Sequence, residues 1–158
     1  GSRYARFQAF LRGPGAVIDH LAGLRARQPT THAGHNPLGA LAILAMLAAL
    51  VFQAVTGLFA NDDIMLEGPL THLVSYETSR MLTSWHKTNY LVIAGLAGLH
   101  LCAVGLYAML IKEPLIRPML TGYKWLPDST EPARHLLPRA LVTAALAAAL
   151  VYSLVTWL

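Results

Sequence analysis

The chain has 158 residues, of which 55% are hydrophobic and 13% are charged, and its mean hydropathy is +0.48. Soluble globular domains carry charge on about a quarter of their residues, so this composition excludes an ordinary soluble domain and indicates an integral membrane protein. The single cysteine, Cys102, excludes a disulfide framework or a thiolate cluster, and the absence of a CxxCH motif excludes covalently attached c-type haem.

Residues 1–37 are basic and hold two apolar clusters, which are separated by a Gly-Pro-Gly break at residues 13–15. In the second cluster, Val17, Leu21 and Leu24 recur at helical spacing. The pattern predicts two short amphipathic helices that lie on the membrane surface. An ordinary connecting loop with some helix is the alternative.

Two histidines, His32 and His35, precede the first long apolar segment. They could form a metal site, but Gly34 and Pro37 make a helical presentation of the pair unfavourable. We therefore favour a capping turn, in which Asn36 and Pro37 start the first long helix.

Three apolar segments are long enough, at about 20 residues, to cross a bilayer. They are residues 38–59, 86–111 and 140–158. The sequence therefore predicts an all-α integral membrane bundle, with residues 1–158 forming a single membrane domain. Gln53 and Thr56 lie near the far end of the first segment, where Gly57 allows a helix or a flat ligand to approach closely.

The distribution of charge predicts which connections lie on which side of the membrane. The connection between the first two spans is acidic, so we expect it to lie outside. Its residues 75–84 are predicted to start a helix that runs into the second span, and its His72 is either a ligand or, as we favour, an exposed loop histidine.

Residues 1–37 and 112–139 are basic and are predicted to be cytoplasmic, so the C-terminus is predicted to be periplasmic. Pro114 is predicted to end the second span just beyond Lys112. The same topology accounts for the net charge of +4 without a nucleic-acid partner.

The second span carries two histidines, His86 and His100, which are fourteen residues apart. An α-helix rises about 1.5 Å and turns about 100° per residue, so the imidazoles lie roughly 21 Å apart and about 40° from eclipsed. An ionisable side chain at membrane depth is costly and marks a functional candidate. Two histidines on one face predict two similar sites, one above the other.

Four interpretations of the histidine pair compete. Each histidine could have a structural role and hydrogen-bond across the helix bundle. The presence of two histidines on the same face of one helix makes this interpretation weaker than it would be for one. A zinc or copper site lacks further ligands within the spans, and a proton relay lacks carboxylates. Haem remains, because imidazole is a common axial ligand and a porphyrin suits an apolar bundle. Gly95, Gly98 and Gly105 near His100 fit both a flat macrocycle and plain helix packing.

Four motifs in a fixed order carry a family resemblance. They are GHNPLG at residues 34–39, TGLFANDD at residues 56–63, EGPLTHLVS at residues 67–75, and the WH…H set of Trp85, His86 and His100. Together they resemble the bacterial di-haem cytochrome b-561 family, which includes the b-type cytochrome subunits of nickel–iron hydrogenases. The resemblance covers nearly the whole chain.

The resemblance implies two b-type haems, with His86 as an axial ligand of the haem nearer the outer face and His100 of the haem nearer the cytoplasm. In that family the opposing ligands come from two earlier spans. We expect this sequence to lack those spans, because its opening GSRYARF resembles the loop that follows them. The remaining histidines lie outside the spans and are poor candidates for the missing ligands: His20, His32, His35, His72 and His135.

The resemblance also implies a function in the bacterial inner membrane. The protein would carry electrons between the quinone pool and a redox partner, such as a periplasmic cytochrome c or a hydrogenase-like subunit, with membrane lipid around it. Haem b is the implied cofactor, and quinone is a further candidate. One alternative is a non-catalytic membrane anchor of a larger complex, with structural histidines. A small transporter would need broken helices and a polar midplane cavity, for which only Gln53, Thr56 and the histidines offer side chains.

Overall fold

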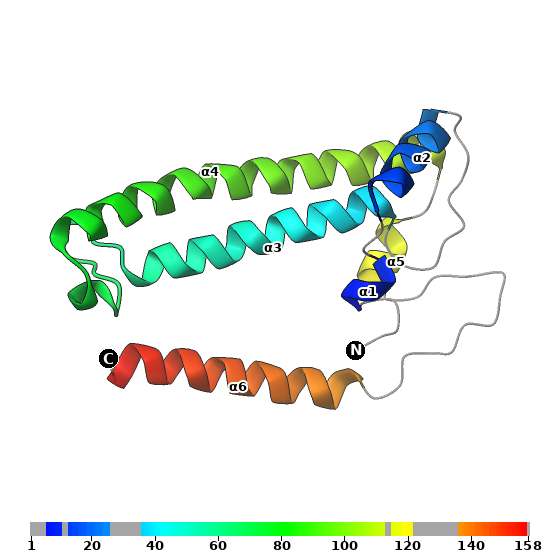
Figure 1. The fold of residues 1–158 in the computed structure, drawn as a ribbon. Helices are drawn as coiled ribbons and strands as arrows, with labels where there is room; N and C mark the ends of the chain where they lie inside the picture. The colour runs from blue at the N-terminus through cyan, green and yellow to red at the C-terminus, as the bar shows by residue number, and fades with distance from the viewer. Residues whose placement is uncertain (1–5, 11–12, 26–35, 113–114, 122–135, 158) are drawn as a thin grey trace. The chain divides into compact units, whose positions relative to one another are not determined.

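The structure, a computed structural model, describes residues 6–10, 13–25, 36–112, 115–121 and 136–157. These ranges contain helices and no strand, with one isolated bridge between Asn61 and Glu67. Figure 1 shows the helices in order along the chain. They are α1 (Phe7–Phe10), α2 (Pro14–Arg25), α3 (Pro37–Leu58), η2 (Thr71–Leu73), α4 (Tyr76–Leu106), η3 (Tyr107–Ile111), α5 (Ile116–Thr121) and α6 (Leu136–Trp157).

The chain divides into two compact units. The first comprises Gly1–Ala45 and Leu96–Arg134, and the second comprises Met46–Gly95 and His135–Leu158. The long helices α3 and α4 each contribute residues to both units. That residues 1–158 act as a single membrane domain stays a prediction.

Three of the described helices are long and apolar enough to cross a membrane, which confirms the predicted all-α membrane class. They span Pro37–Leu58, Tyr76–Leu110 and Leu137–Thr156. The second is much longer than a bilayer needs, because its 31 α-helical residues correspond to about 46 Å and a hydrocarbon core is about 30 Å thick.

The starts of α3 and α4 follow from their caps. Asn36 accepts a 2.6 Å hydrogen bond from the Gly39 backbone N–H through its side-chain oxygen, and Pro37 occupies the first helical position. The predicted capping turn is therefore confirmed, whereas His32 and His35 lie outside the described residues. Ser75 caps α4 in the same way through the Thr78 N–H, so this helix does begin before the second span.

The end of α4 is a distinct local structure. After Leu106 the helix widens into one π-helical segment, η3, and Lys112 then takes a left-handed conformation with a φ of 57°. A residue in this conformation is a common helix terminator. The helical segment therefore ends at Ile111, which is also the predicted end of the second span.

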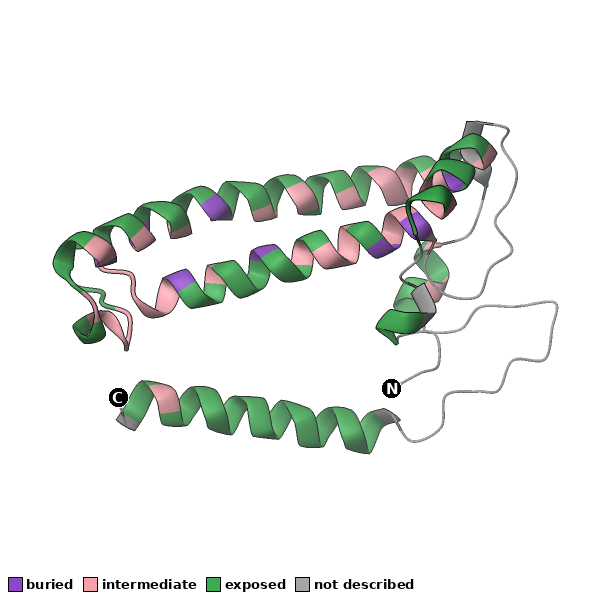
Figure 2. Cartoon of the chain, viewed as in Figure 1, coloured by how far each residue is buried: buried purple, intermediate pink, exposed green. Residues whose placement is uncertain are grey.

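Exposure along α4 follows a stripe with a spacing of three to four residues (Figure 2), as expected of a helix that is covered along one face. In the first part of α4 the covered positions are polar except for Leu82, and in the second part they are mostly apolar. The covered positions include Ser79, Thr83, His86, Asn89, Ile93, Leu96, His100, Ala103 and Val104. The described side chains of α6, in contrast, are nearly all exposed.

Candidate functional site

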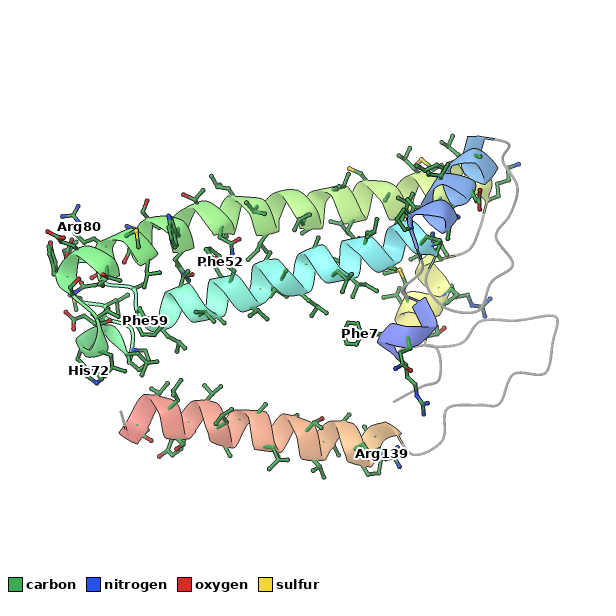
Figure 3. The ribbon with its side chains drawn as sticks, viewed as in Figure 1. Phe7, Phe52, Phe59, His72, Arg80 and Arg139 are labelled. Carbon is green, nitrogen blue, oxygen red and sulfur yellow. The ribbon has the colours of Figure 1, made fainter. Side chains whose placement is uncertain are left out.

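In the second unit, polar side chains of α4 hold the adjoining part of α3 and the connection that follows it. Ser79, which is 1% exposed, donates a 2.8 Å hydrogen bond to the carbonyl of Phe59, which is labelled in Figure 3. Farther along, Asn89 donates to the Ala49 carbonyl at 2.9 Å. Because Ser79 pairs with Phe59, just beyond the end of α3, and Asn89 pairs with the earlier Ala49, the two helix segments run antiparallel.

His86 lies between these contacts, and α3 supplies partners for both of its ring nitrogens. Nδ1 lies 3.0 Å from the Gln53 carbonyl oxygen and 3.3 Å from Thr56 Oγ1. Nε2 lies 3.0 Å from the side-chain amide nitrogen of Gln53. The imidazole is thus held in place within the second unit by α3.

Four neighbours shape the space around His86. Gly57 lies beneath the ring, and a Cβ added there would stand 2.9 Å from His86 Cε1, which is closer than real Cβ contacts come. Asn89 donates a 2.7 Å hydrogen bond to the Gln53 side-chain oxygen, so it fixes the amide that faces the imidazole. Phe52 and Trp85 pack beside the site, with ring centroids 6.2 Å apart.

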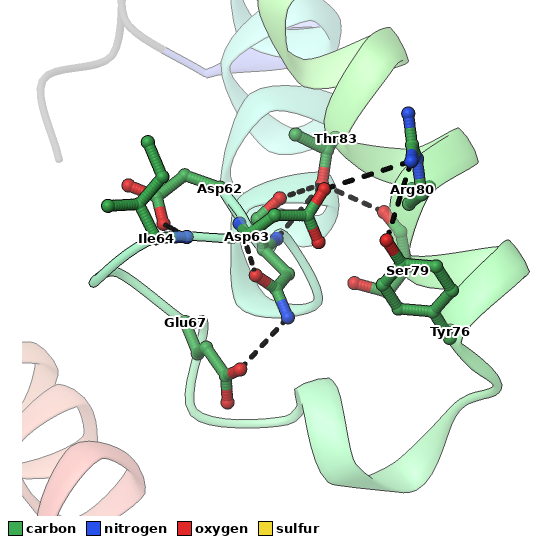
Figure 4. Close-up of polar contacts among 9 residues, drawn as sticks. Asp62, Asp63, Ile64, Glu67, Tyr76, Ser79, Arg80 and Thr83 are labelled. Carbon is green, nitrogen blue, oxygen red and sulfur yellow. Dashed lines mark hydrogen bonds and ion pairs between the residues drawn. The ribbon is translucent and has the colours of Figure 1, made fainter.

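The connection beyond α3 is closed by a network of hydrogen bonds (Figure 4). Thr83, on α4, accepts a 2.9 Å bond from the Asn61 backbone N–H. The Asp62 carboxylate accepts bonds from three successive backbone N–H groups, those of residues 64–66. These bonds, above all the one from Leu66, lower the pKa of Asp62 below its ordinary value.

A polar hollow lies beside this connection and includes residues of both signs. Asp62 and Asp63 line it together with Arg80 and Lys87. Arg80 also approaches the Asp63 carboxylate at 3.9 Å, with both side chains well exposed. Because the charges are mixed and the ion pair is exposed, the hollow has no clear preference for an anion or a cation.

His100 has different surroundings. It is half-buried and makes no hydrogen bond to any residue that the structure describes. A helix turns about 100° per residue, so Gly95, Gly98 and Gly105 lie roughly 140–160° away from His100 on α4. A Cβ added at any of these three glycines would meet nothing within 4 Å. The glycines therefore face away from His100 and do not provide the low-relief surface beside it.

In the first unit, a second polar cluster ties α2 to the ends of the long helices. His20 Nε2 lies 2.7 Å from the Tyr107 hydroxyl, and Asn36 donates to the same hydroxyl at 3.2 Å. The His20 and Tyr107 rings are stacked with an interplanar angle of 11°. This cluster connects the amphipathic helix α2 to η3 and to the cap of α3.

The other histidines do not join either site. His72 is exposed in η2 (Figure 3), as expected of a loop histidine, and His135 lies outside the described residues. Within the described ranges, no group of three or more His, Cys, Asp or Glu side chains could hold a metal ion.

The family model for prokaryotic cytochrome b561 matches residues 3–122, which include α3, α4 and both span histidines. The chain belongs to the prokaryotic cytochrome b561 family. Searches of curated proteins and of solved structures give no match. Family membership, together with the three apolar helices, indicates a multi-pass membrane b-type cytochrome in electron transfer, surrounded by lipid and served by redox partners. It also implies that haem b is bound.

The residues of α4 fit a haem ligand set by their chemistry. His86 has Nδ1 on a carbonyl oxygen, which is the usual support of a metal-bound imidazole, and His100 has a side chain without a competing hydrogen bond in the described residues. Sequence reasoning missed the contribution of Asn89, whereas it did predict a close approach at Gly57. A polar residue three positions after His86 in an apolar span was the signal that could have revealed Asn89.

Proposed function

We propose that this protein is a b-type cytochrome that carries electrons across or within the bacterial inner membrane, between the quinone pool and a redox partner. The supporting observation is that α4 is one uninterrupted helix, lies within the family match, and carries His86 and His100 on its covered stripe. Each histidine serves as an axial ligand of a different haem b. A periplasmic cytochrome c or a hydrogenase-like subunit is the proposed partner.

The two haems, when bound, supply one-electron chemistry, and the chain positions them. His86 offers Nε2 while its Nδ1 stays on the Gln53 carbonyl. His100 offers an imidazole on the covered stripe of α4, between the apolar positions Leu96 and Val104. No other histidine occurs in α3, α4 or α6, so the opposing ligands come from outside these helices.

The proposed topology places residues 1–37 and 112–139 in the cytoplasm and the C-terminus in the periplasm. His86 then lies nearer the periplasmic face and His100 nearer the cytoplasmic face. Quinone would exchange electrons with one of the two haems, and the partner protein with the other.

Haem content of the purified full chain tests this function. Protein from haem-replete cells should show a reduced α-band, and His86→Leu and His100→Leu should each lose one haem equivalent and keep the other. His72→Leu, which changes the exposed histidine of η2, is the matched control and should keep both. A wild-type protein without an α-band, or a His100 variant with unchanged haem content, would contradict the assignment.

One observation favours a second candidate, a membrane anchor whose histidines are structural. Both nitrogens of His86 have protein partners on α3. The same haem measurement separates the two functions, because an anchor protein would purify without haem while remaining folded in detergent.

A further inference from the structure

The orientation of every polar group around His86 can be traced to backbone carbonyls. A carbonyl oxygen only accepts hydrogen bonds, and the Ala49 carbonyl lies 2.9 Å from an amide atom of Asn89. That atom must therefore be the NH2 nitrogen of Asn89, which is 8% exposed and has little freedom to turn. The Asn89 amide is thus fixed by the backbone of α3.

The fixed Asn89 amide in turn orients Gln53. Its nitrogen lies 2.7 Å from one side-chain atom of Gln53, and a donor there requires the Gln53 oxygen. The Gln53 nitrogen is left to face His86 Nε2 at 3.0 Å. Since this nitrogen can only donate, His86 Nε2 must accept and therefore carries no proton.

The other ring nitrogen leads to the same conclusion independently. His86 Nδ1 lies 3.0 Å from the Gln53 backbone carbonyl, which can only accept, so Nδ1 carries the proton. Both contacts agree on one neutral tautomer, with N–H at Nδ1 and a lone pair at Nε2. A doubly protonated ring would place an N–H against the amide N–H of Gln53.

We propose that Gln53, Asn89 and Gly57 are positioning residues that hold His86 in the tautomer required of an axial ligand before any iron is bound. Gly57 acts by allowing the ring to reach the Gln53 carbonyl, since a Cβ would stand 2.9 Å from Cε1. This inference rests on the proposed haem function of His86. His86 would offer the lone pair at Nε2 to the haem iron in place of the Gln53 amide, while the backbone carbonyl keeps its bond to Nδ1.

The decisive variant is Gln53→Glu, which keeps the shape of the side chain and its bond from Asn89 but replaces the donor at Nε2 by an acceptor. Since the backbone carbonyl still faces Nδ1, both ring nitrogens then face acceptors, so the variant should add an N–H at Nε2 and remove the same haem equivalent that His86→Leu removes. Gln8→Glu makes the same chemical change at an exposed position of α1 and should alter neither property.

Gly57→Ala tests the close approach separately. It should weaken binding of one haem about 10- to 100-fold, as loss of a hydrogen-bonded support of a metal ligand commonly does. Gly98→Ala, at an α4 glycine with nothing within 4 Å, should leave haem binding unchanged. Equal effects of the two alanine variants would contradict the role of Gly57.

The tautomer is measured on the full chain prepared without haem, in detergent, from the nitrogen chemical shifts of labelled histidine, with His86→Leu identifying the signal. A proton on Nδ1 alone in the wild type, and a proton on both ring nitrogens in Gln53→Glu, are the expected results. A proton on Nε2 in the wild type, or an Nε2 without a proton in Gln53→Glu, would overturn the inference even if haem is bound. Absence of haem from the native protein would overturn the proposed function instead, because the tautomer measurement does not use haem.

Discussion

Around His86, the covered stripe of α4 consists mostly of polar side chains, and the imidazole has a partner on α3 for each ring nitrogen. Around His100, the covered positions are apolar, among them Leu96 and Val104, and the imidazole makes no hydrogen bond within the described residues. The first site is therefore organised by the protein alone, whereas the orientation of the second depends on what binds there. Two histidines of the same helix thus differ in how far each is prepared for a ligand.

The largest effect on stability is expected at Gly68, where the connection after α3 packs against the end of that helix. Gly68 donates to the Ala60 carbonyl at 2.7 Å, and a Cβ at Gly68 would collide with the backbone at the end of α3, including the Gly57 carbonyl oxygen at 2.5 Å. Since neither backbone can give way cheaply, Gly68→Ala should lower the free energy of unfolding by about 3 kcal/mol. Thermal unfolding in detergent measures this.

Gly98→Ala is the control for Gly68→Ala, because it adds a methyl group to open space and replaces glycine by a better helix former. It should leave stability unchanged or raise it slightly. A Gly68 variant as stable as Gly98→Ala would show that the connection is not held against α3.

Replacing each histidine tests the comparison directly in the haem-free protein. His86→Ala leaves the Gln53 amide without its acceptor and removes the bond from Nδ1, which should cost about 2 kcal/mol. His100→Ala removes no hydrogen bond among the described residues and should cost less than about 1 kcal/mol. Equal losses in unfolding experiments would mean that the two sites are equally organised.

Much of this fold is predictable from the sequence, because each long helix has a local signal. Hydropathy locates the three spans, and the Asn36-Pro37 pair marks the start of α3. The two-histidine pattern of α4 is equally local. In contrast, the chain from Asn89 through Gln53 to His86 joins positions 33 to 36 residues apart, and only the pairing of α3 with α4 brings them together.

The glycines of α4 show a second limit of prediction from sequence. Gly95, Gly98 and Gly105 are close to His100 in sequence, yet helical geometry places them on the other side of α4. Proximity in sequence is a poor guide to a shared surface in a helix, whereas a spacing of three, four or seven residues is a good one.

A smaller effect is expected at the cap of α3, in the other unit. Asn36 accepts from the Gly39 N–H and donates to the Tyr107 hydroxyl. Asn36→Ala should therefore cost about 1 kcal/mol, the usual contribution of an N-cap. Asn36→Ser keeps a capping oxygen but has no amide to donate to Tyr107, so a full loss of stability in this variant as well would assign the effect to Tyr107 and not to the cap.

The smallest effect is a dependence on pH in the connection after α3. The pKa of Asp62 is lowered by its bonds from the backbone N–H groups of residues 64–66, so the carboxylate stabilises this turn above its ordinary pKa of 3.8. The stabilisation is lost as the pH falls through the lower pKa of the folded state. Amide protection of residues 64–66 should therefore be retained at pH 5 and fall at strongly acidic pH, once corrected for intrinsic exchange. Asp62→Asn should reduce protection already at pH 5, whereas Asp63→Asn, which tolerates the left-handed φ of 62°, should not. If both variants behave alike, the three bonds to Asp62 do not hold the turn.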